Sequence, residues 1–293
     1  MKWRLHRRGS GLAWRDAGNR HGPPIVLLHG FFQDGRAWAE PLRRLPQAEV
    51  EQFHWIAVDL PGHGASAGVQ LAALGQGAWP GLALLLDEAV DAALGRDRQR
   101  VTVVGYSFGG RAAAWWLGCT SAAMTQDSSL PWRGLAGRGV AAALLESAHP
   151  GLAASSAALR RQEDQARAVA VLQSDVEAFG HFWSNLALFA TQQGLPAAIL
   201  RAQQRIRLSQ SAPGLADHLL SLGTGTMPQL DRPPAPPWPT AFLAGEMDPN
   251  YAALARSWQQ TWPQSSLVIA PGAGHNVHLE SPALWWSSLR TLT

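Results

Sequence analysis

The sequence has one cysteine and one lysine, and these shortages exclude several classes of protein. Cys119 is alone among 293 residues, so the chain can form neither an internal disulfide nor a zinc site built from several cysteines. Lys2 is the one lysine, and all the other basic residues are arginine. The arginines do not gather with aromatic residues into a dense basic run, which argues against a nucleic-acid-binding surface.

The sequence also lacks segments that would target or anchor it. No apolar run approaches the roughly 20 residues that cross a bilayer. The first ten residues carry positive charge, but no apolar stretch follows them, which is unlike a secretory signal. The ten histidines show no metal-ligand spacing such as H-E-x-x-H, and no phosphate-binding Walker A pattern occurs. We therefore expect a cytoplasmic chain, without membrane insertion, metal or organic cofactor, that is a monomer or a weak homo-oligomer.

Hydrophobic residues make up 46% of the sequence, enough for a large core. Short apolar runs without alternation recur along the chain, separated by helical or loop segments. This pattern is typical of a mainly parallel sheet that is buried on both faces. The runs are 25–28, 55–58, 101–104, 140–145, 240–243 and 267–270, and we expect flanking helices at 82–94 and 281–291.

One interval differs from the rest. Residues 151–225 contain no strand-like run and are rich in Ala, Leu, Gln and Arg, which predicts several helices. A long helical insertion between two strands of one sheet is typical of a cap over the active-site edge. We therefore expect an α/β core formed by residues 1–150 and 226–293, with a helical cap formed by 151–225.

The segment Gly105–Gly109 reads Gly-Tyr-Ser-Phe-Gly and follows an apolar run, with a helical segment after it. Strand, sharp turn and helix are the context in which G-x-S-x-G forms a nucleophile elbow, with the serine hydroxyl exposed at the tip. The same pattern occurs around Ser66, but there it lies in a loop of small residues with no strand leading into it. Ser107 is therefore the candidate nucleophile or base.

A serine hydroxyl needs a histidine to take its proton, and that histidine needs a carboxylate to orient it. In folds with such an elbow, the chain order is serine, acid, histidine. Asp248 follows the late apolar run 240–243 and is the predicted acid, with Glu246 as the alternative.

The last apolar run is followed by Pro271-Gly272-Ala273-Gly274-His275. His275 is the predicted base, and His278 is the alternative, expected on the surface or behind the site. Any one of these residues could be an ordinary solvated loop residue. Their occurrence in the required order, each after a strand, favours a catalytic triad.

The first apolar run ends in His29-Gly30-Phe31. The backbone N–H of Phe31 can point toward the active site, where it would join the N–H of Phe108, the residue after the serine. We predict that these two groups form an oxyanion hole.

These motifs resemble the α/β-hydrolase superfamily over nearly the full length of the chain. The matching segments are His29–Phe31, Asp59–Gly64, Gly105–Gly109, Asp248 and Gly274–His275. Three longer segments, Gly105–Arg111, Glu146–Leu152 and Ala273–His278, resemble one branch, the 2-succinyl-6-hydroxy-2,4-cyclohexadiene-1-carboxylate synthase (MenH) family of menaquinone and phylloquinone biosynthesis.

The resemblance implies a set of substrate-binding side chains. In that family, arginines after the elbow and in the cap bind the carboxylates of the substrate, and a tyrosine and a cap tryptophan line the pocket. The matching positions are Tyr106, Arg111, Arg161 with Arg160 as its neighbour in register, Trp183, and Arg207 with Arg205 as the alternative.

The activity implied is a lyase reaction on a small tricarboxylate. Pyruvate is eliminated from 2-succinyl-5-enolpyruvyl-6-hydroxy-3-cyclohexene-1-carboxylate to give 2-succinyl-6-hydroxy-2,4-cyclohexadiene-1-carboxylate. Arginine suits such a substrate because its planar fork pairs with a carboxylate through two hydrogen bonds. The alternative is a serine hydrolase on the same fold: a carboxylesterase, a carrier-protein methyl-ester esterase or a carbon–carbon bond hydrolase.

Overall fold

The computed structural model describes residues 1–9, 11–70, 77–95, 99–124, 135, 138–230 and 236–293. Within these ranges, eight strands form one sheet in the order β1-β2-β4-β3-β5-β6-β7-β8. The strands are β1 (Arg4–Arg7), β2 (Ala13–Gly18), β3 (Pro24–Leu28), β4 (His54–Val58), β5 (Val101–Tyr106), β6 (Val140–Glu146), β7 (Thr240–Gly245) and β8 (Ser266–Ala270).

The predicted parallel sheet is confirmed. Each of the six apolar runs forms a strand. These six strands, β3 to β8, pair with one another in parallel. The antiparallel strands β1 and β2 were not predicted. They mix Arg, His and Asp with apolar residues, and β1 is largely exposed at the edge of the sheet, so neither gives the signal of a buried strand.

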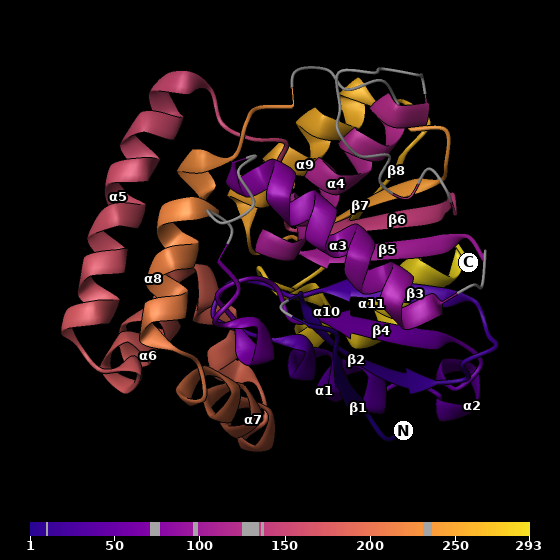
Figure 1. Cartoon of the computed structure of the whole chain (residues 1–293), viewed down its shortest axis with the longest axis horizontal. Coiled ribbons are helices and arrows are strands. Elements are labelled where there is room, and N and C mark those ends of the chain that lie inside the picture. The colour runs from indigo at the N-terminus through magenta and orange to yellow at the C-terminus, as the bar shows by residue number, and fades with distance from the viewer. Residues whose placement is uncertain (10, 71–76, 96–98, 125–134, 136–137, 231–235) are drawn as a thin grey trace.

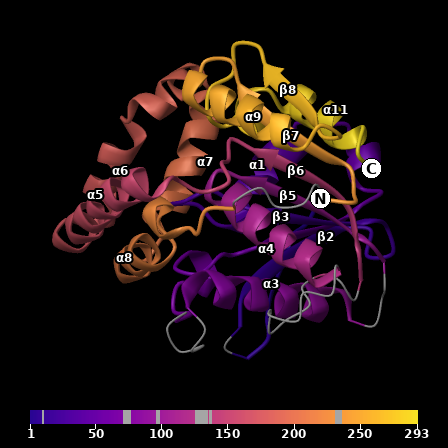
Figure 2. The ribbon, with the colours of Figure 1, turned by 90° about the horizontal axis from the view of Figure 1, so that it is seen from above.

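Helices cover both faces of the sheet. One face packs against α3 (Ala78–Leu94), α4 (Phe108–Met124) and α9 (Pro249–Thr261), and Figure 2 shows α3 and α4 side by side. The other face packs against α1 (Ala39–Arg43), α2 (Gln47–Val50), α10 (Val277–Glu280) and α11 (Pro282–Arg290), with tryptophans 38, 55, 285 and 286 in the core. Among the described residues, no helix combines the length and apolar character needed to span a membrane.

A group of helices lies between β6 and β7 in the chain and gathers at one side of the sheet (Figure 1). It consists of α5 (Ala154–Gln173), α6 (Val176–Ser184), the 3-10 helix η5 (Ala187–Gly194), α7 (Ala197–Leu208), α8 (Ala212–Ser221) and the 3-10 helix η6 (Thr224–Thr226). No strand interrupts residues 151–225, as the sequence predicts. Phe32, from the loop after β3, is fully buried among side chains of α5, α6 and α8. Its ring therefore packs the helical group against the sheet-bearing core.

The turn between β5 and α4 is the tightest point of the fold. A Cβ on Gly105 would lie 2.3 Å from the carbonyl oxygen of Gly109, and a Cβ on Gly109 would lie 2.0 Å from that of Leu28. Between them, Ser107 adopts a left-handed backbone conformation with a φ of 52°, which is strained for a residue with a side chain. The glycines therefore allow the strained serine to be held at the carboxyl edge of the sheet.

Replacing Gly109 with alanine tests this packing. Because the added methyl group meets backbone atoms that cannot move aside freely, we expect the free energy of unfolding to fall by about 2 kcal/mol or more. The matched control is Gly68→Ala, since a Cβ on Gly68 meets nothing within 4 Å. Its free energy of unfolding should change by no more than about 0.5 kcal/mol. Equal effects of the two changes in urea-induced unfolding would contradict the account.

Candidate active site

Ser107, His275 and Asp248 form a hydrogen-bonded row at the carboxyl edge of the sheet. The Oγ of Ser107 lies 2.9 Å from Nε2 of His275, and Nδ1 of His275 lies 2.7 Å from Oδ2 of Asp248. The three residues follow β5, β8 and β7, respectively. Both His275 and Asp248 are buried, so their hydrogen bond is shielded from water. The arrangement can take a proton from the serine hydroxyl.

Backbone contacts fix the acid of this row. Oδ1 of Asp248 accepts a hydrogen bond from the N–H of Tyr251 at 3.3 Å and caps the first turn of α9. Its other oxygen is then directed at the imidazole. The Tyr251 ring packs against His275 with ring centroids 4.5 Å apart.

The loop that carries His275 is held on both sides. The carboxylate of Glu280 accepts hydrogen bonds from the N–H groups of Gly274 at 2.7 Å and Asn276 at 3.3 Å. The hydroxyl of Ser147 donates to the carbonyl oxygen of His275 at 2.7 Å. Sequence reasoning missed Glu280 and Ser147, because a hydrogen bond from a side chain to a distant loop leaves no motif.

The two alternative triad members lie elsewhere. Glu246 is exposed, and its carboxylate accepts a hydrogen bond from the N–H of Gly272 at 3.0 Å. His278 is buried, with its Nδ1 2.9 Å from both carboxylate oxygens of Glu146. Of the two positions expected for His278, behind the site or on the surface, the structure shows the first, because the short helix α10 directs its ring inward against Trp38.

Phe31 and Phe108 both line the cavity above Ser107, and among the described residues no hydrogen-bond acceptor is found for their backbone N–H groups. Two buried histidines shape the turn that carries Phe31. Nε2 of His29 accepts from the N–H of Leu60 at 2.9 Å, and Nε2 of His63 accepts from the N–H of Phe32 at 3.1 Å.

Both of these histidines must be neutral to accept such hydrogen bonds. Burial lowers the pKa of His63 to about 3 and also lowers that of His29. The turn is therefore fixed by imidazoles that stay uncharged at neutral pH. This structural role of His29 and His63 was not predicted from the sequence.

The cavity above Ser107 has a volume of about 170 Å³. It is lined by residues of the sheet edge and of the helical group, and many of them have aromatic rings: Phe31, Tyr106, Phe108, Trp183, Phe189, His218 and Tyr251. Burial raises the pKa of Tyr106 well above its ordinary value, so its hydroxyl keeps its proton. Tyr106 and Trp183 both line the cavity, and their binding of substrate stays a prediction.

His218, on α8, was not predicted to line the cavity. It is buried edge-on against Phe108 with ring centroids 4.2 Å apart, and its Nδ1 has no hydrogen-bond partner among the described residues. Burial lowers its pKa well below the ordinary value, so the ring is neutral.

Arg111 carries a buried positive charge into this cavity. It lies on α4, and its guanidinium lies over the ring of Phe108 at 5.3 Å and that of Trp79 at 5.7 Å. Its one hydrogen bond among the described residues is a long one, 3.5 Å, to the carbonyl oxygen of Leu222, and it forms no ion pair with them. Burial lowers its pKa to about 10, so it stays charged at neutral pH. A buried charge without a counter-ion is costly, which favours an anionic ligand here.

The second arginine at the cavity is Arg160 and not Arg161. Arg160 pairs with Asp164 at 2.8 Å, and both side chains line the cavity. Arg161 is exposed, and its guanidinium donates to the carbonyl oxygen of Gly225 at 2.9 Å. Successive residues on a helix point about 100° apart, so an error of one residue in register moves the side chain off this face. The prediction for Arg161 is corrected accordingly.

Arg207 also lies outside the catalytic cavity. Its guanidinium donates to Oγ of Ser184 at 2.5 Å and lies over the ring of Phe189 at 5.9 Å. Phe189 belongs to the 3-10 helix η5 and lines the catalytic cavity, so Arg207 lies next to that cavity without lining it. Arg205, the alternative, lines a second cavity, which lies beside α7.

Within the described ranges, no three His, Cys, Asp or Glu side chains are grouped as ligands for a metal ion. The chemistry that these residues can support is proton transfer or nucleophilic attack by Ser107, beside one buried, unpaired guanidinium.

Comparisons with known proteins agree with this geometry. Residues 25–286 match the model of the alpha/beta hydrolase family. A Bacillus subtilis (strain 168) protein, provisionally assigned as a 2-succinyl-6-hydroxy-2,4-cyclohexadiene-1-carboxylate synthase, is 31% identical over 94% of this chain and 92% of its own length. A protein of Salmonella schwarzengrund (strain CVM19633) with that synthase name is 29% identical over 89% of this chain and 90% of its own.

A solved structure gives the same result. MenH from S. aureus superimposes with a TM-score of 0.77 at 27% identity, covering 95% of this chain and 97% of that one. Sequence and fold agree over almost the whole length, so this chain belongs to the alpha/beta hydrolase family and, within it, to the 2-succinyl-6-hydroxy-2,4-cyclohexadiene-1-carboxylate synthases.

Proposed function

We propose that the chain is a lyase that eliminates pyruvate from 2-succinyl-5-enolpyruvyl-6-hydroxy-3-cyclohexene-1-carboxylate. The product is 2-succinyl-6-hydroxy-2,4-cyclohexadiene-1-carboxylate, an intermediate of menaquinone or phylloquinone biosynthesis. Two relatives that align with 94% and 89% of the chain carry the name of this activity.

The observation that carries the proposal is the buried guanidinium of Arg111 beside the serine–histidine–aspartate row. The ionisable groups that line the cavity include Arg111, Arg160 and Asp164, so positive charge exceeds negative charge there. A neutral ester would leave this charge without a partner. A carboxylate of the substrate would pair with it through two parallel hydrogen bonds.

The first chemical step is removal of the proton beside the succinyl ketone. The hydroxyl proton of Ser107 moves to Nε2 of His275, and the serine oxygen takes the acidic ring proton of the substrate. The carboxylate of Asp248 then faces an imidazolium, which it stabilises at 2.7 Å. No covalent bond to the serine forms in this reaction.

The electrons of the broken C–H bond move onto the ketone oxygen, giving an enolate. The N–H groups of Phe31 and Phe108 are free to donate to that oxygen and would stabilise the charge. When the enolate collapses, the ring double bond shifts and the bond from the ring to the enolpyruvyl oxygen breaks. Pyruvate leaves as its enolate and is protonated at carbon, and loss of the extra proton from His275 restores the starting state of the row.

Residues 151–225 would act as the cap of this site. Phe179, Trp183 and Phe189 turn their rings inward, and Phe179 and Phe189 are almost fully buried. Phe182 is half exposed and contributes less. An aromatic roof excludes water, and a low dielectric strengthens the pairing of Arg111 with a carboxylate.

The alternative is a serine hydrolase that uses the same row of residues with Ser107 as nucleophile. A carboxylesterase, a carrier-protein methyl-ester esterase or a carbon–carbon bond hydrolase would each fit the fold. These activities do not explain the unpaired charge of Arg111 as well.

Incubation with the enolpyruvyl substrate, while pyruvate release is followed, tests the proposal. We expect rapid release by the wild-type protein and a fall in kcat of about 10³-fold or more for Ser107→Ala, with an unchanged melting temperature. Release of alcohol from short aryl esters, without pyruvate from the enolpyruvyl substrate, would favour a hydrolase instead.

Two neighbouring arginines test the corrected register. Arg160→Gln should raise KM about three- to tenfold, because a charge-assisted hydrogen bond is worth about 1.5–3 kcal/mol and Arg160 already shares its charge with Asp164. Asp164 keeps its pairing with Arg167, so the fold should hold. Arg161→Gln is the matched control and should leave KM within about twofold. An effect of Arg161→Gln as large as that of Arg160→Gln would contradict the placement.

A further inference from the structure

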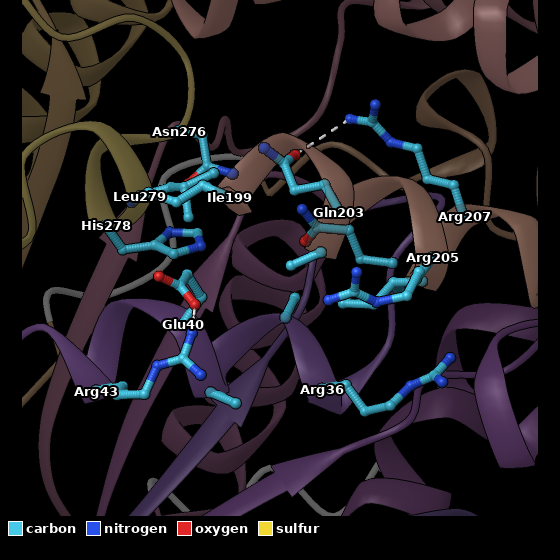
Figure 3. Close-up of a pocket in the computed structure, with 15 residues that line it drawn as sticks. Arg36, Glu40, Arg43, Ile199, Gln203, Arg205, Arg207, Asn276, His278 and Leu279 are labelled. Carbon is cyan, nitrogen blue, oxygen red and sulfur yellow. Dashed lines mark hydrogen bonds and ion pairs between the residues drawn. The ribbon is translucent and has the colours of Figure 1, made fainter. Parts of the chain in front are cut away.

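A second cavity, of about 310 Å³, lies between the helical group and the core. Figure 3 shows its three sides: Arg36, Glu40 and Arg43 from the segment after β3, Gln203, Arg205 and Arg207 from α7, and Asn276, His278 and Leu279 from the turn after His275. It has no lining residue in common with the catalytic cavity. It is therefore a separate space, and no role in the proposed reaction uses it.

The positive charges of this cavity are only partly balanced. The guanidinium of Arg36 pairs with Asp34 at 2.6 Å, and that of Arg43 pairs with Glu40. Arg205 makes no hydrogen bond or ion pair with the residues that the structure describes. Among the described residues, the hydrogen bonds of the Arg207 guanidinium go to neutral groups, the hydroxyl of Ser184 and the amide oxygen of Gln203.

Two of the polar groups without a charged partner are shielded from solvent. The side chain of Arg207 is half-buried, and burial lowers the pKa of its guanidinium. The side-chain Nε2 of Gln203 is buried and has no hydrogen-bond partner among the described residues. An unpaired buried donor costs about 1–3 kcal/mol, and an acceptor on a ligand would remove that cost.

The rest of the lining is mainly apolar. It comes from Ala37, Ala39, Ile199, Ala202, Ile206 and Leu279, with the amide of Gln33 among them. Apolar walls with a few converging donors are typical of small-molecule sites, and the volume falls in the range of such sites. A ligand that fits would have an apolar body and carboxylate groups facing α7.

We propose that this cavity is a second binding site, which takes a small cyclic dicarboxylate through Arg205, Arg207 and Gln203. The site lies next to the catalytic residues, since Asn276 and His278 follow His275 in the chain. The ring of Phe189, which lines the catalytic cavity, packs edge-on against His275 at 6.0 Å and lies under the guanidinium of Arg207 at 5.9 Å, so a residue of the second cavity contacts one of the catalytic cavity.

Phthalate is a suitable probe, because it places two carboxylates on a rigid apolar ring, and phthalamide has the same shape without charge. Titration calorimetry of the full chain should detect phthalate binding and at least tenfold weaker binding of phthalamide. Arg205→Gln should weaken phthalate binding by about tenfold. The matched control is Arg43→Gln, whose guanidinium is already paired, and it should change the affinity by less than twofold.

Three results would overturn the proposal: no phthalate binding, equal binding of phthalamide, or full binding by Arg205→Gln. Loss of binding in Arg111→Gln, with full binding in Arg205→Gln, would place the probe in the catalytic cavity. Arg205 is exposed, so its replacement should not alter folding, which the unfolding midpoint checks. The titration requires no turnover, so its outcome is independent of whether pyruvate release is observed.

Discussion

The close approach of backbone segments at the carboxyl edge of the sheet is the constraint on which the site depends. Gly109 lies against the carbonyl of Leu28, and Gly245 lies so close to Gly274 that a Cβ would come within 2.0 Å of its carbonyl oxygen. These contacts bring the ends of β3, β5, β7 and β8 together. Only then can a strained serine, an imidazole and a carboxylate form hydrogen bonds across 168 and 27 residues of sequence.

The parts of the molecule with strong local signals could be predicted from the sequence. Buried parallel strands appear as continuous apolar runs, and the flanking glycines of Ser107 identify a tight turn. The order of Ser107, Asp248 and His275 after three such strands was enough to indicate which residues would meet, and the structure brings these three together. Here local sequence and global fold specify the same arrangement.

The rest could not be predicted because it depends on rotation, register or contacts between distant segments. The choice between Arg160 and Arg161 requires the rotation of α5, which a loosely patterned helix does not reveal. The guanidinium of Arg207 packs over the ring of Phe189, a contact between α7 and η5 that the sequence does not reveal. The pairing of His278 with Glu146 joins residues 132 positions apart in the chain, and neither residue lies in a motif that predicts it.

The buried guanidinium of Arg111, which has no ion-pair partner among the described residues, is the feature of this site that a hydrolase for neutral esters would not need. Steady-state kinetics of Arg111→Lys with the enolpyruvyl tricarboxylate test this claim most directly. Because an ammonium group cannot reproduce the planar fork of guanidinium, we expect KM to rise about tenfold or more while the melting temperature stays the same. An unchanged KM for the tricarboxylate would contradict the account.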